Sequence, residues 1–169
     1  MKAAMERRWL EVQMEQVRKE QRWKAAPGVV EFPSGRRIRG RSWRQQAEEP
    51  ADLCIMLTTG VGSRLGGNFV TSSANETIAI DWPDYRLPRR TSQAHDVLKT
   101  AWERSASERV EIVCRGGVGR TGTALAIIAV LEGMDPQEAI DFIKQNYAHD
   151  AVETPAQRAF VRDMGAERN

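Results

Sequence analysis

Short apolar runs alternate with amphipathic stretches along this chain, and the alternation predicts its secondary structure. The near-continuous apolar run Leu53–Leu57 is typical of a strand buried on both faces of a sheet. From Thr91 onward the apolar residues recur with helical spacing, at Ala94, Val97, Leu98, Ala101 and Trp102. Strands interleaved with helices in this way predict an α/β fold with a central, largely parallel sheet flanked by helices.

Further strands complete the expected sheet. Residues 29–32 and 36–41 flank the turn sequence Pro33-Ser34-Gly35 and predict a β-hairpin. Residues 77–80 and 110–113 are short apolar segments that predict two more strands.

Three later helices carry start or stop signals. The stretch Ala124–Leu131 is apolar almost all round, as expected of a buried helix, and Gly133 is its expected stop. Asp135-Pro136 opens a second helix with a capping side chain and a proline at its first position. Thr154-Pro155-Ala156-Gln157 opens the last helix with the residues of a capping box.

The first 24 residues differ in composition from the rest. They are rich in Glu, Gln, Lys and Arg, and their large apolar residues form only a loose helical stripe, at Trp9, Leu10, Val12, Met14 and Val17. This pattern predicts a peripheral helix that is partly docked and partly solvated, and that ends at Pro27-Gly28. We therefore expect an N-terminal helix in residues 1–26 and a single catalytic domain in residues 27–169.

Composition limits the kind of protein that this is. A net charge of +2 over 169 residues indicates no nucleic-acid partner. Two cysteines far apart in the sequence favour a reducing compartment over a disulfide scaffold. The N-terminus lacks the apolar core of a signal peptide, and the longest apolar run is too short to span a bilayer. We expect a cytoplasmic protein without a membrane span, of undetermined oligomeric state.

No metal or cofactor is expected. The two histidines, His95 and His149, have no metal-ligand partners near them in the sequence.

The segment Cys114–Thr121 carries the clearest chemical signal. It joins the strand expected at residues 110–113 to a helix expected to begin near Thr121 or Gly122, so the Cys114 thiol lies at a helix N-terminus. Unpaired N–H groups and the positive end of the helix dipole attract anions there. The same field lowers a thiol's pKa and favours the nucleophilic thiolate. The segment therefore predicts a phosphate-binding loop with a nucleophile at its base.

The other residues of this segment suit an oxyanion. Arg120 offers a planar fork of donors to two phosphoryl oxygens. The glycines let the loop turn its N–H groups inward, where side chains would obstruct the phosphate. A nucleotide-binding Walker loop is not indicated, because the lysine that it needs is missing. The predicted phosphate-binding residues are Arg115, Gly116, Gly117, Val118, Gly119 and Arg120.

The spacing of Cys114, Arg120 and Thr121 resembles the signature of the cysteine-dependent protein phosphatases, the tyrosine and dual-specificity group. Trp82-Pro83-Asp84 resembles the general-acid loop of that family, in the right order and at the right distance. The resemblance covers residues 50–160 and points to a compact, bacterial-looking member. It implies a phosphomonoester hydrolase in which Cys114 forms a phosphocysteine intermediate that water then hydrolyses.

The resemblance also implies roles for further residues. Asp84 is the expected general acid, with Asp81 as a rival carboxylate three residues earlier. Thr121 either hydrogen-bonds the thiolate and eases its departure or caps the following helix. Gln157 either positions the hydrolytic water or serves as the capping partner of Thr154.

One position departs from the family pattern. A histidine usually precedes the nucleophile, where it orients the cysteine and helps to keep its pKa low, whereas this chain has Val113. The thiolate then depends on the loop amides, the helix terminus and Arg120. The expected consequence is a weaker activity or a shifted pH optimum.

The substrate stays open at this point. A phosphorylated protein is the first candidate and a phosphoinositide or other small phosphomonoester the second. Lipid phosphatases of this kind tend to carry two basic residues in the loop, and this chain has Arg115 but Val118. A third hypothesis for the function is a catalytically weakened phosphate-binding module that is not an enzyme.

Arg37, Arg39 and Arg41 would share one face of a strand. They would either steer anions toward the site or guard a solvated edge strand against aggregation.

Two further features carry weaker signals. Residues 58–75 are rich in Gly, Ser and Thr and predict a loop, in which residues 59–66 faintly resemble a nucleotidyltransferase loop. Cys54 lies in a predicted buried strand and is expected to belong to the core. A disulfide between Cys54 and Cys114 under oxidation is the alternative.

Overall fold

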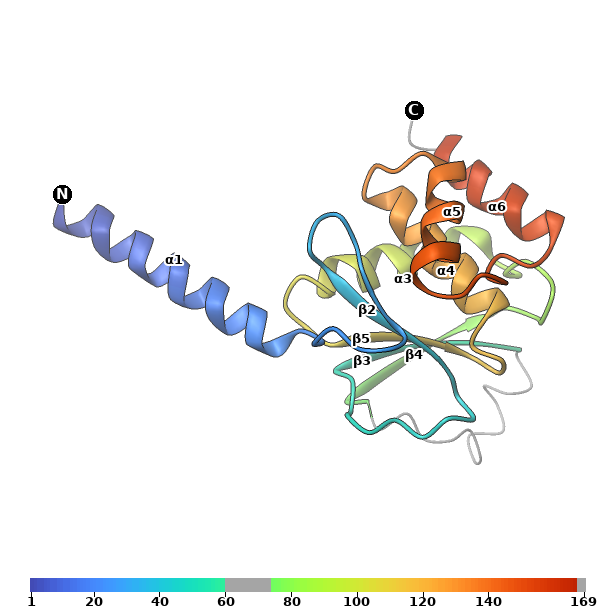
Figure 1. Cartoon of the computed structure of the whole chain (residues 1–169), viewed down its shortest axis with the longest axis horizontal. Coiled ribbons are helices and arrows are strands. Elements are labelled where there is room, and N and C mark those ends of the chain that lie inside the picture. Colours follow the sequence, from blue (N-terminus) through green and yellow to red (C-terminus); the bar gives the residue numbers. More distant parts are fainter. Residues whose placement is uncertain (60–73, 167–169) are drawn as a thin grey trace.

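A computed structural model describes residues 1–59 and 74–166, which contain one mostly parallel sheet (Figure 1). Its strands are, in chain order, β1 (Val29–Glu31), β2 (Arg37–Ser42), β3 (Leu53–Thr58), β4 (Glu76–Asp81) and β5 (Val110–Cys114). Their order across the sheet is β1-β2-β5-β3-β4, and among these described strands only β1 runs antiparallel to its neighbour. The α/β fold expected from the sequence is confirmed.

Parallel pairing brings the carboxyl ends of four strands to one edge of the sheet. In register, Ser42 of β2 lies opposite Cys114 of β5, and Thr58 of β3 lies opposite Asp81 of β4. Ligands of open α/β sheets bind beside such an edge. The segments that leave these strand ends are therefore the ones that can build a site together.

The main core lies between the sheet and four helices. Because side chains alternate along a strand, Leu53, Ile55 and Leu57 of β3 all enter this core. The helices gather on the same side of the sheet in Figure 1: α3 (Thr91–Arg104), α4 (Gly119–Leu131), α5 (Pro136–Asn146) and α6 (Pro155–Ala166). Helix α4 is buried along nearly its whole length and packs against the other three.

The opposite face of the sheet carries a smaller apolar cluster of Cys54, Met56 and Val113, against which Trp43 and Ala74 pack. Cys114 belongs to the main core, so Cys54 and Cys114 point to opposite faces. Cys54 also pairs with Glu111, three residues before Cys114. At about 3.3 Å per residue along a strand, this separation exceeds the reach of a disulfide. The alternative of a Cys54–Cys114 disulfide is therefore wrong.

Strand β2 is an inner strand, between β1 and β5, and its arginines are paired. The Nη2 atoms of Arg39 and Arg41 lie 2.6 Å and 2.9 Å from the carboxylate of the buried Glu111 on β5. Arg37 pairs with Glu31 of β1 at 2.6 Å. The expectation of a solvated edge strand is therefore wrong, because β2 lies inside the sheet. The expectation of an anion-steering face is also wrong, because each of the three guanidinium groups is turned to a carboxylate of a neighbouring strand.

The later turn and capping signals are confirmed, but the expected stop of the first helix at Pro27-Gly28 is wrong, because that helix ends at Gln21. Gly35 takes a φ of 84° in the turn between β1 and β2, which a side chain would disfavour. The Asp135 side chain accepts a hydrogen bond from the Gln137 N–H at 2.9 Å. Thr154 and Gln157 exchange two hydrogen bonds of 3.1 Å, as a capping box requires.

Helix α4 begins at Gly119, earlier than the expected start near Thr121 or Gly122. The reason is that the Gly122 N–H already donates to the Val118 carbonyl at 2.7 Å, which closes a first helical turn within the glycine segment. Most of the predicted loop at 58–75, including the part that resembles a nucleotidyltransferase loop, lies outside the described residues.

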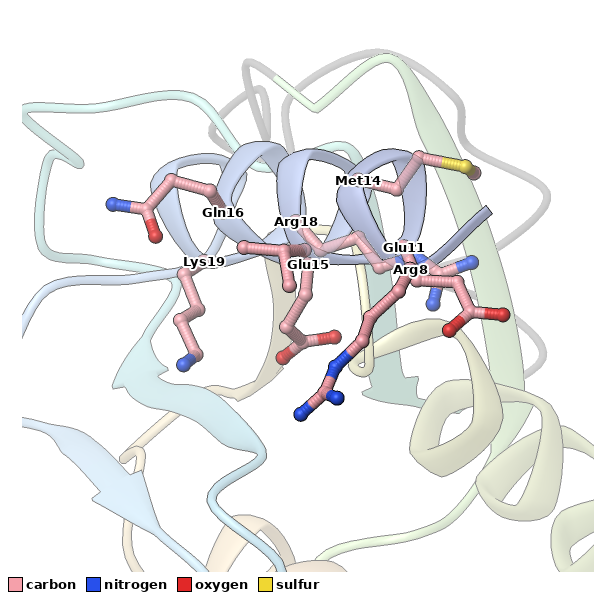
Figure 2. A pocket seen from close by; sticks show the side chains of 8 residues that line it. Arg8, Glu11, Met14, Glu15, Gln16, Arg18 and Lys19 are labelled. Atoms are coloured by element: carbon pink, nitrogen blue, oxygen red, sulfur yellow. The ribbon is translucent and has the colours of Figure 1, made fainter. Parts of the chain in front are cut away.

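Helix α1 (Lys2–Gln21) projects away from the domain (Figure 1). It has no buried residue, and Trp9, Leu10 and Met14 are all more than half exposed. The expectation of partial docking is wrong, because the apolar residues are spread around the helix and form no single face to cover. The hollow in Figure 2 is lined by α1 alone, between Arg8 and Lys19, and holds none of the candidate site residues.

Trp23 anchors the N-terminal segment to the domain. Its side chain is 4% exposed, and its indole N–H donates to the Val110 carbonyl of β5 at 2.7 Å. The guanidinium of Arg39 lies 3.8 Å from the centre of its ring. This attachment lies two residues after the end of α1.

Two deletions separate the helix from its anchor. Removal of residues 1–21 is expected to leave the stability of the domain nearly unchanged, because these residues bury no side chain. Removal of residues 1–26, at the boundary predicted from the sequence, also removes Trp23 and is expected to cost about 3–5 kcal/mol. Thermal unfolding of both variants beside the full chain measures the difference. Equal melting temperatures for the two deletions would contradict the anchoring role of Trp23.

Candidate active site

The Cys114 thiol lies at the carboxyl edge of the sheet, where β5 turns into α4. Cys114 is the last residue of β5, and residues 115–118 connect it to Gly119 at the start of α4. Its side chain is 2% exposed, and its sulfur accepts a hydrogen bond from the Gly117 N–H at 3.1 Å. The thiol therefore lies at the base of a loop whose backbone curls over it, as the sequence predicted.

Donors from outside hold three carbonyl groups of this loop. The Trp43 N–H donates to the Cys114 carbonyl at 3.0 Å, the Ser42 hydroxyl donates to the Arg115 carbonyl, and the Tyr147 hydroxyl donates to the Gly117 carbonyl. In a planar trans peptide, the C=O and the following N–H point in opposite directions. The described residues contain no cis peptide, so the N–H groups that follow these carbonyls point away from β2 and α5, toward the loop interior.

This arrangement makes a ready-made anion site. Backbone N–H groups turned to one point stabilise negative charge without having to reorganise. The first turn of α4 adds the positive end of the helix dipole. The loop therefore offers an oxyanion groups that are already in place.

The glycine positions of the loop differ in how much space they leave for a side chain. Gly117 has a φ of 70°, and a methyl group added there would lie 2.6 Å from the carbonyl carbon of Arg41. A methyl group at Gly119 would lie 2.8 Å from the carboxyl carbon of Glu153. One at Gly116 would meet no atom within 4 Å. Close contact with the end of β2 thus requires glycine at position 117, whereas position 116 is open.

The Arg120 guanidinium is buried and held by backbone carbonyls. It is 3% exposed, and its Nη1 donates to the carbonyls of Leu57 at 3.1 Å and of Trp82 at 2.9 Å. Its Nε lies 3.4 Å from Asp84 Oδ1 without making a hydrogen bond to any described residue. Arg120 is therefore fixed by the ends of two strands, beside the predicted general acid.

The predicted acid loop follows β4 and is anchored by its tryptophan. Trp82 is fully buried, its indole N–H donates to the Arg86 carbonyl at 2.8 Å, and its ring packs edge-on against Phe160. Asp84 is half exposed and faces Arg120, whereas the Asp81 carboxylate lies 3.4 Å from Arg89. The structure thus brings Asp84, rather than Asp81, to the loop.

Thr121 and Gln157 are both fully buried. The N-cap of α4 is Val118, so Thr121 lies inside the first turn and does not cap the helix. Its hydroxyl has no hydrogen-bond partner among the described residues. Gln157 forms the capping box with Thr154, and its side-chain N–H₂ group has no partner in the same part of the chain. Each residue therefore has a buried polar group without a hydrogen-bond partner among the described residues.

Tyr147 was not identified from the sequence. It follows α5, and its ring covers Gly40 so closely that a methyl group there would lie 2.6 Å from the ring. Burial raises the pKa of Tyr147, and the negative charge of Cys114 raises it further, so the hydroxyl stays a donor. No local pattern marks this residue, because its partners at Gly40 and Gly117 are far away in the sequence.

Glu153 was also missed. Its carboxyl group lies against Gly119 at the rim of the loop. The one signal in the sequence is that Glu153 directly precedes the capping residue Thr154. The backbone has a fixed geometry where a loop enters a helix, so the position of Glu153 is predictable. That signal says nothing about which way the carboxylate points.

Neither a metal site nor a membrane span is found in the described part of the chain. No group of three or more His, Cys, Asp or Glu side chains there is arranged to hold a metal ion. None of the helices described is long and apolar enough to cross a bilayer.

Residues 27–166 match the family described as "Swiss Army Knife protein, DSP-PTPase phosphatase domain" (PTP-SAK). Since the match covers most of the chain, the chain belongs to this family. The resemblance to tyrosine and dual-specificity phosphatases inferred from the sequence is thereby confirmed.

Relatives of this chain include archaeal and structurally known proteins. Uncharacterized protein MJ0215 of Methanocaldococcus jannaschii is 36% identical over 87 residues, which are 50% of this chain and 52% of that protein. The chain spans about half the length of this curated relative. Tk-PTP in its active form is 21% identical with a TM-score of 0.64, over 84% of this chain and 99% of that chain. PTPMT1 in complex with PI(5)P is 19% identical with a TM-score of 0.55, over 68% and 76% of the two chains. At these identities, the two structures show a common fold.

The two neighbouring glycines provide a matched test of the loop geometry. Gly117→Ala is expected to abolish detectable sulfate binding and to lower stability by more than about 1 kcal/mol, because it combines a positive φ with a clash against β2. Gly116→Ala is expected to keep both properties close to those of the original protein. Titration calorimetry with sulfate and thermal unfolding measure the two effects. Equal losses in both variants would mean that the loop needs glycine at 116 for a reason other than space.

Proposed function

We propose that this protein hydrolyses phosphomonoesters through a phosphocysteine intermediate, with Cys114 as the nucleophile. The observation that carries the proposal is the placement of the Cys114 thiol under inward-facing N–H groups, with the Arg120 guanidinium and the Asp84 carboxyl group at the same loop. These are the parts that a two-step phosphoryl transfer needs. Membership of the phosphatase family supports it.

In the first step, the Cys114 thiolate attacks phosphorus and forms an S–P bond. The P–O bond to the leaving group breaks, and the leaving oxygen takes a proton from the Asp84 carboxyl group. Arg120 and the loop N–H groups bind the three other phosphoryl oxygens as charge moves onto them. The product alcohol then leaves, and the phosphoryl group stays on sulfur.

In the second step, water attacks the phosphocysteine. The Asp84 carboxylate takes a proton from this water, an O–P bond forms, and the S–P bond breaks to release inorganic phosphate and the thiolate. The buried Thr121 hydroxyl has no other partner in the described residues and is suited to donate to the departing sulfur. The amide of Gln157 is proposed to hold the water, a role that stays a prediction beside its capping box.

The thiolate is proposed to manage without the histidine that usually precedes it. Val113 fills that position and packs with Cys54 and Met56 on the opposite face of the sheet, where it offers no hydrogen bond. The Gly117 N–H, the first turn of α4 and Arg120 are the groups left to stabilise negative charge on sulfur. Weaker activity or a shifted pH optimum remains the expected consequence.

A phosphorylated protein is the proposed substrate. Arg115 is the one basic side chain of residues 115–119, and it is exposed at the loop rim. Val118 occupies the place where a lipid phosphatase would tend to add a second. The complex of PTPMT1 with PI(5)P shows that this fold can accept a phosphoinositide, which keeps lipids as the second candidate.

Cys114→Ser tests the nucleophile. The variant is expected to lose turnover of p-nitrophenyl phosphate by at least about 10³-fold, because a hydroxyl at this position is not ionised. Sulfate binding measured by calorimetry should persist, since the N–H groups and Arg120 remain. Retained hydrolysis in this variant would contradict the phosphocysteine route.

Asp84→Asn tests the general acid, with Asp81→Asn as the matched control. We expect the first variant to lose about 10²–10⁴-fold in kcat and to lose the basic limb of the pH profile. The second variant should stay within a few-fold of the original protein, because Asp81 faces Arg89 instead of Arg120. Steady-state kinetics on an aryl phosphate between pH 4.5 and 8 measure both. The opposite ranking would assign the acid role to Asp81.

A further inference from the structure

Glu153 places a second carboxyl group at the rim of the phosphate loop. Its carboxyl carbon lies so close to Gly119 that a methyl group on that glycine would approach within 2.8 Å. Gly119 is the first residue of α4, where the helix dipole and the unpaired N–H groups favour an anion. Glu153 therefore lies in the part of the site that a phosphate would use.

The backbone fixes Glu153 in this position from both sides. Val152, directly before it, is buried and has a φ of 59°, a conformation that is rare for a β-branched residue. Thr154, directly after it, belongs to the capping box of α6. The Arg158 guanidinium of α6 lies 3.4 Å from the carbonyl oxygens of both Val152 and Glu153. The orientation of the rim is thus held by packing, a helix cap and an arginine.

The charges that face the Glu153 carboxyl group are mostly negative. Burial raises its pKa above the ordinary value for glutamate, and Asp84 of the acid loop and Asp150 of its own loop raise it further. Arg120 of α4 acts in the opposite direction and is the weakest of these influences. Arg158 of α6 directs its guanidinium to backbone carbonyls. The protonated form is therefore favoured over a wider pH range than for an ordinary surface glutamate.

We propose that Glu153 is an anion gate, a specificity-determining residue whose ionised carboxylate opposes phosphate in the loop and whose protonation admits it. A phosphate dianion in the loop adds negative charge beside Glu153 and favours its protonated form. By reciprocity, the ionised form lowers the affinity for the dianion by the same factor. This inference rests on the proposed function only in assuming that the loop binds phosphate.

The direction of the pH effect follows from the raised pKa. At pH values below it, Glu153 is neutral and does not oppose an anion. As pH rises through it, the carboxylate forms and the affinity for a dianion falls. Other groups in the site also change the anion affinity when they titrate. The contribution of Glu153 is therefore measured as the difference in affinity between the original protein and a variant without this carboxylate.

Glu153→Gln is the decisive variant, because it keeps the size and polarity of the side chain and removes the charge. Its dissociation constant for sulfate, an oxyanion whose charge does not change between pH 5 and 8, is measured by calorimetry. At pH 7.5 the variant is expected to bind sulfate about three- to tenfold more tightly, as removal of one nearby charge in a partly hydrated site predicts. At pH 5 the difference should shrink.

Asp163→Asn is the matched control, because it removes one exposed carboxylate from α6, away from Glu153 in sequence. It should leave the sulfate affinity unchanged, which separates the gate from the net charge of the protein. An unchanged sulfate affinity in Glu153→Gln at every pH overturns the proposal.

A different result would assign Glu153 to the chemistry instead. If Glu153→Gln binds sulfate like the original protein but accumulates phosphocysteine during turnover of an aryl phosphate, the residue acts on the hydrolytic water and the gate is overturned. If the original protein binds no sulfate or phosphate, the proposed function fails together with the gate. The two failures are therefore distinguishable.

Discussion

The candidate site depends on one constraint, which is that the carbonyl groups of the Cys114 loop are held on its outer side. A free loop of glycines would present carbonyl oxygens and N–H groups to an anion equally. Donors from Ser42, Trp43 and Tyr147 remove this freedom. Because each peptide is planar, fixing a carbonyl also fixes the N–H that follows it. Residues on the outer side of the loop thus set the direction of the N–H groups on its inner side.

This constraint depends on the order of the strands in the sheet. Parallel pairing of β2 with β5 sets Ser42 opposite Cys114, and so the segment leaving β2 runs beside the loop leaving β5. The buried Glu111 of β5 also joins these two strands, because it accepts hydrogen bonds from Arg39 and Arg41 of β2. Burial disfavours the charged Glu111, but the two arginines outweigh burial and lower its pKa. Arg41 continues to the carbonyls of Ser42 and Gln45, which ties the ion pair to the wall of the site.

Local signals in the sequence predicted the parts of this site that are encoded locally. The interval from Cys114 to Arg120 fixes a loop before a helix, and the capping residues Asp135 and Thr154 fix two helix starts. Hydrogen bonding between neighbours along the chain determines such features, so a short stretch of sequence contains the necessary information.

Contacts between distant segments could not be predicted in the same way. The alternating arginines of β2 suggested an exposed face, because nothing in the sequence pairs them with Glu111 some 70 residues later. Tyr147 reaches the loop only once α5 has packed against α4, which sets the Tyr147 ring over Gly40 of β2. The expected docking of α1 failed for a different reason: its apolar residues are spread around the helix and form no single face that the domain could cover.

Backbone strain gives independent support for the two carboxyl groups at the loop. Among the described residues other than glycine, a positive φ occurs at Tyr85 and Val152. Tyr85 follows Asp84, and Val152 precedes Glu153. Such conformations cost on the order of 1–3 kcal/mol each and persist where surrounding structure over-determines them.

The surrounding structure holds both Tyr85 and Val152 in these conformations. The buried Trp82 ties the acid loop to the Arg86 carbonyl, across Tyr85. The capping box of Thr154 follows Val152, whose own side chain is buried. The two strained residues thus lie next to Asp84 and Glu153, and packing at both places holds a carboxyl group close to the Cys114 loop.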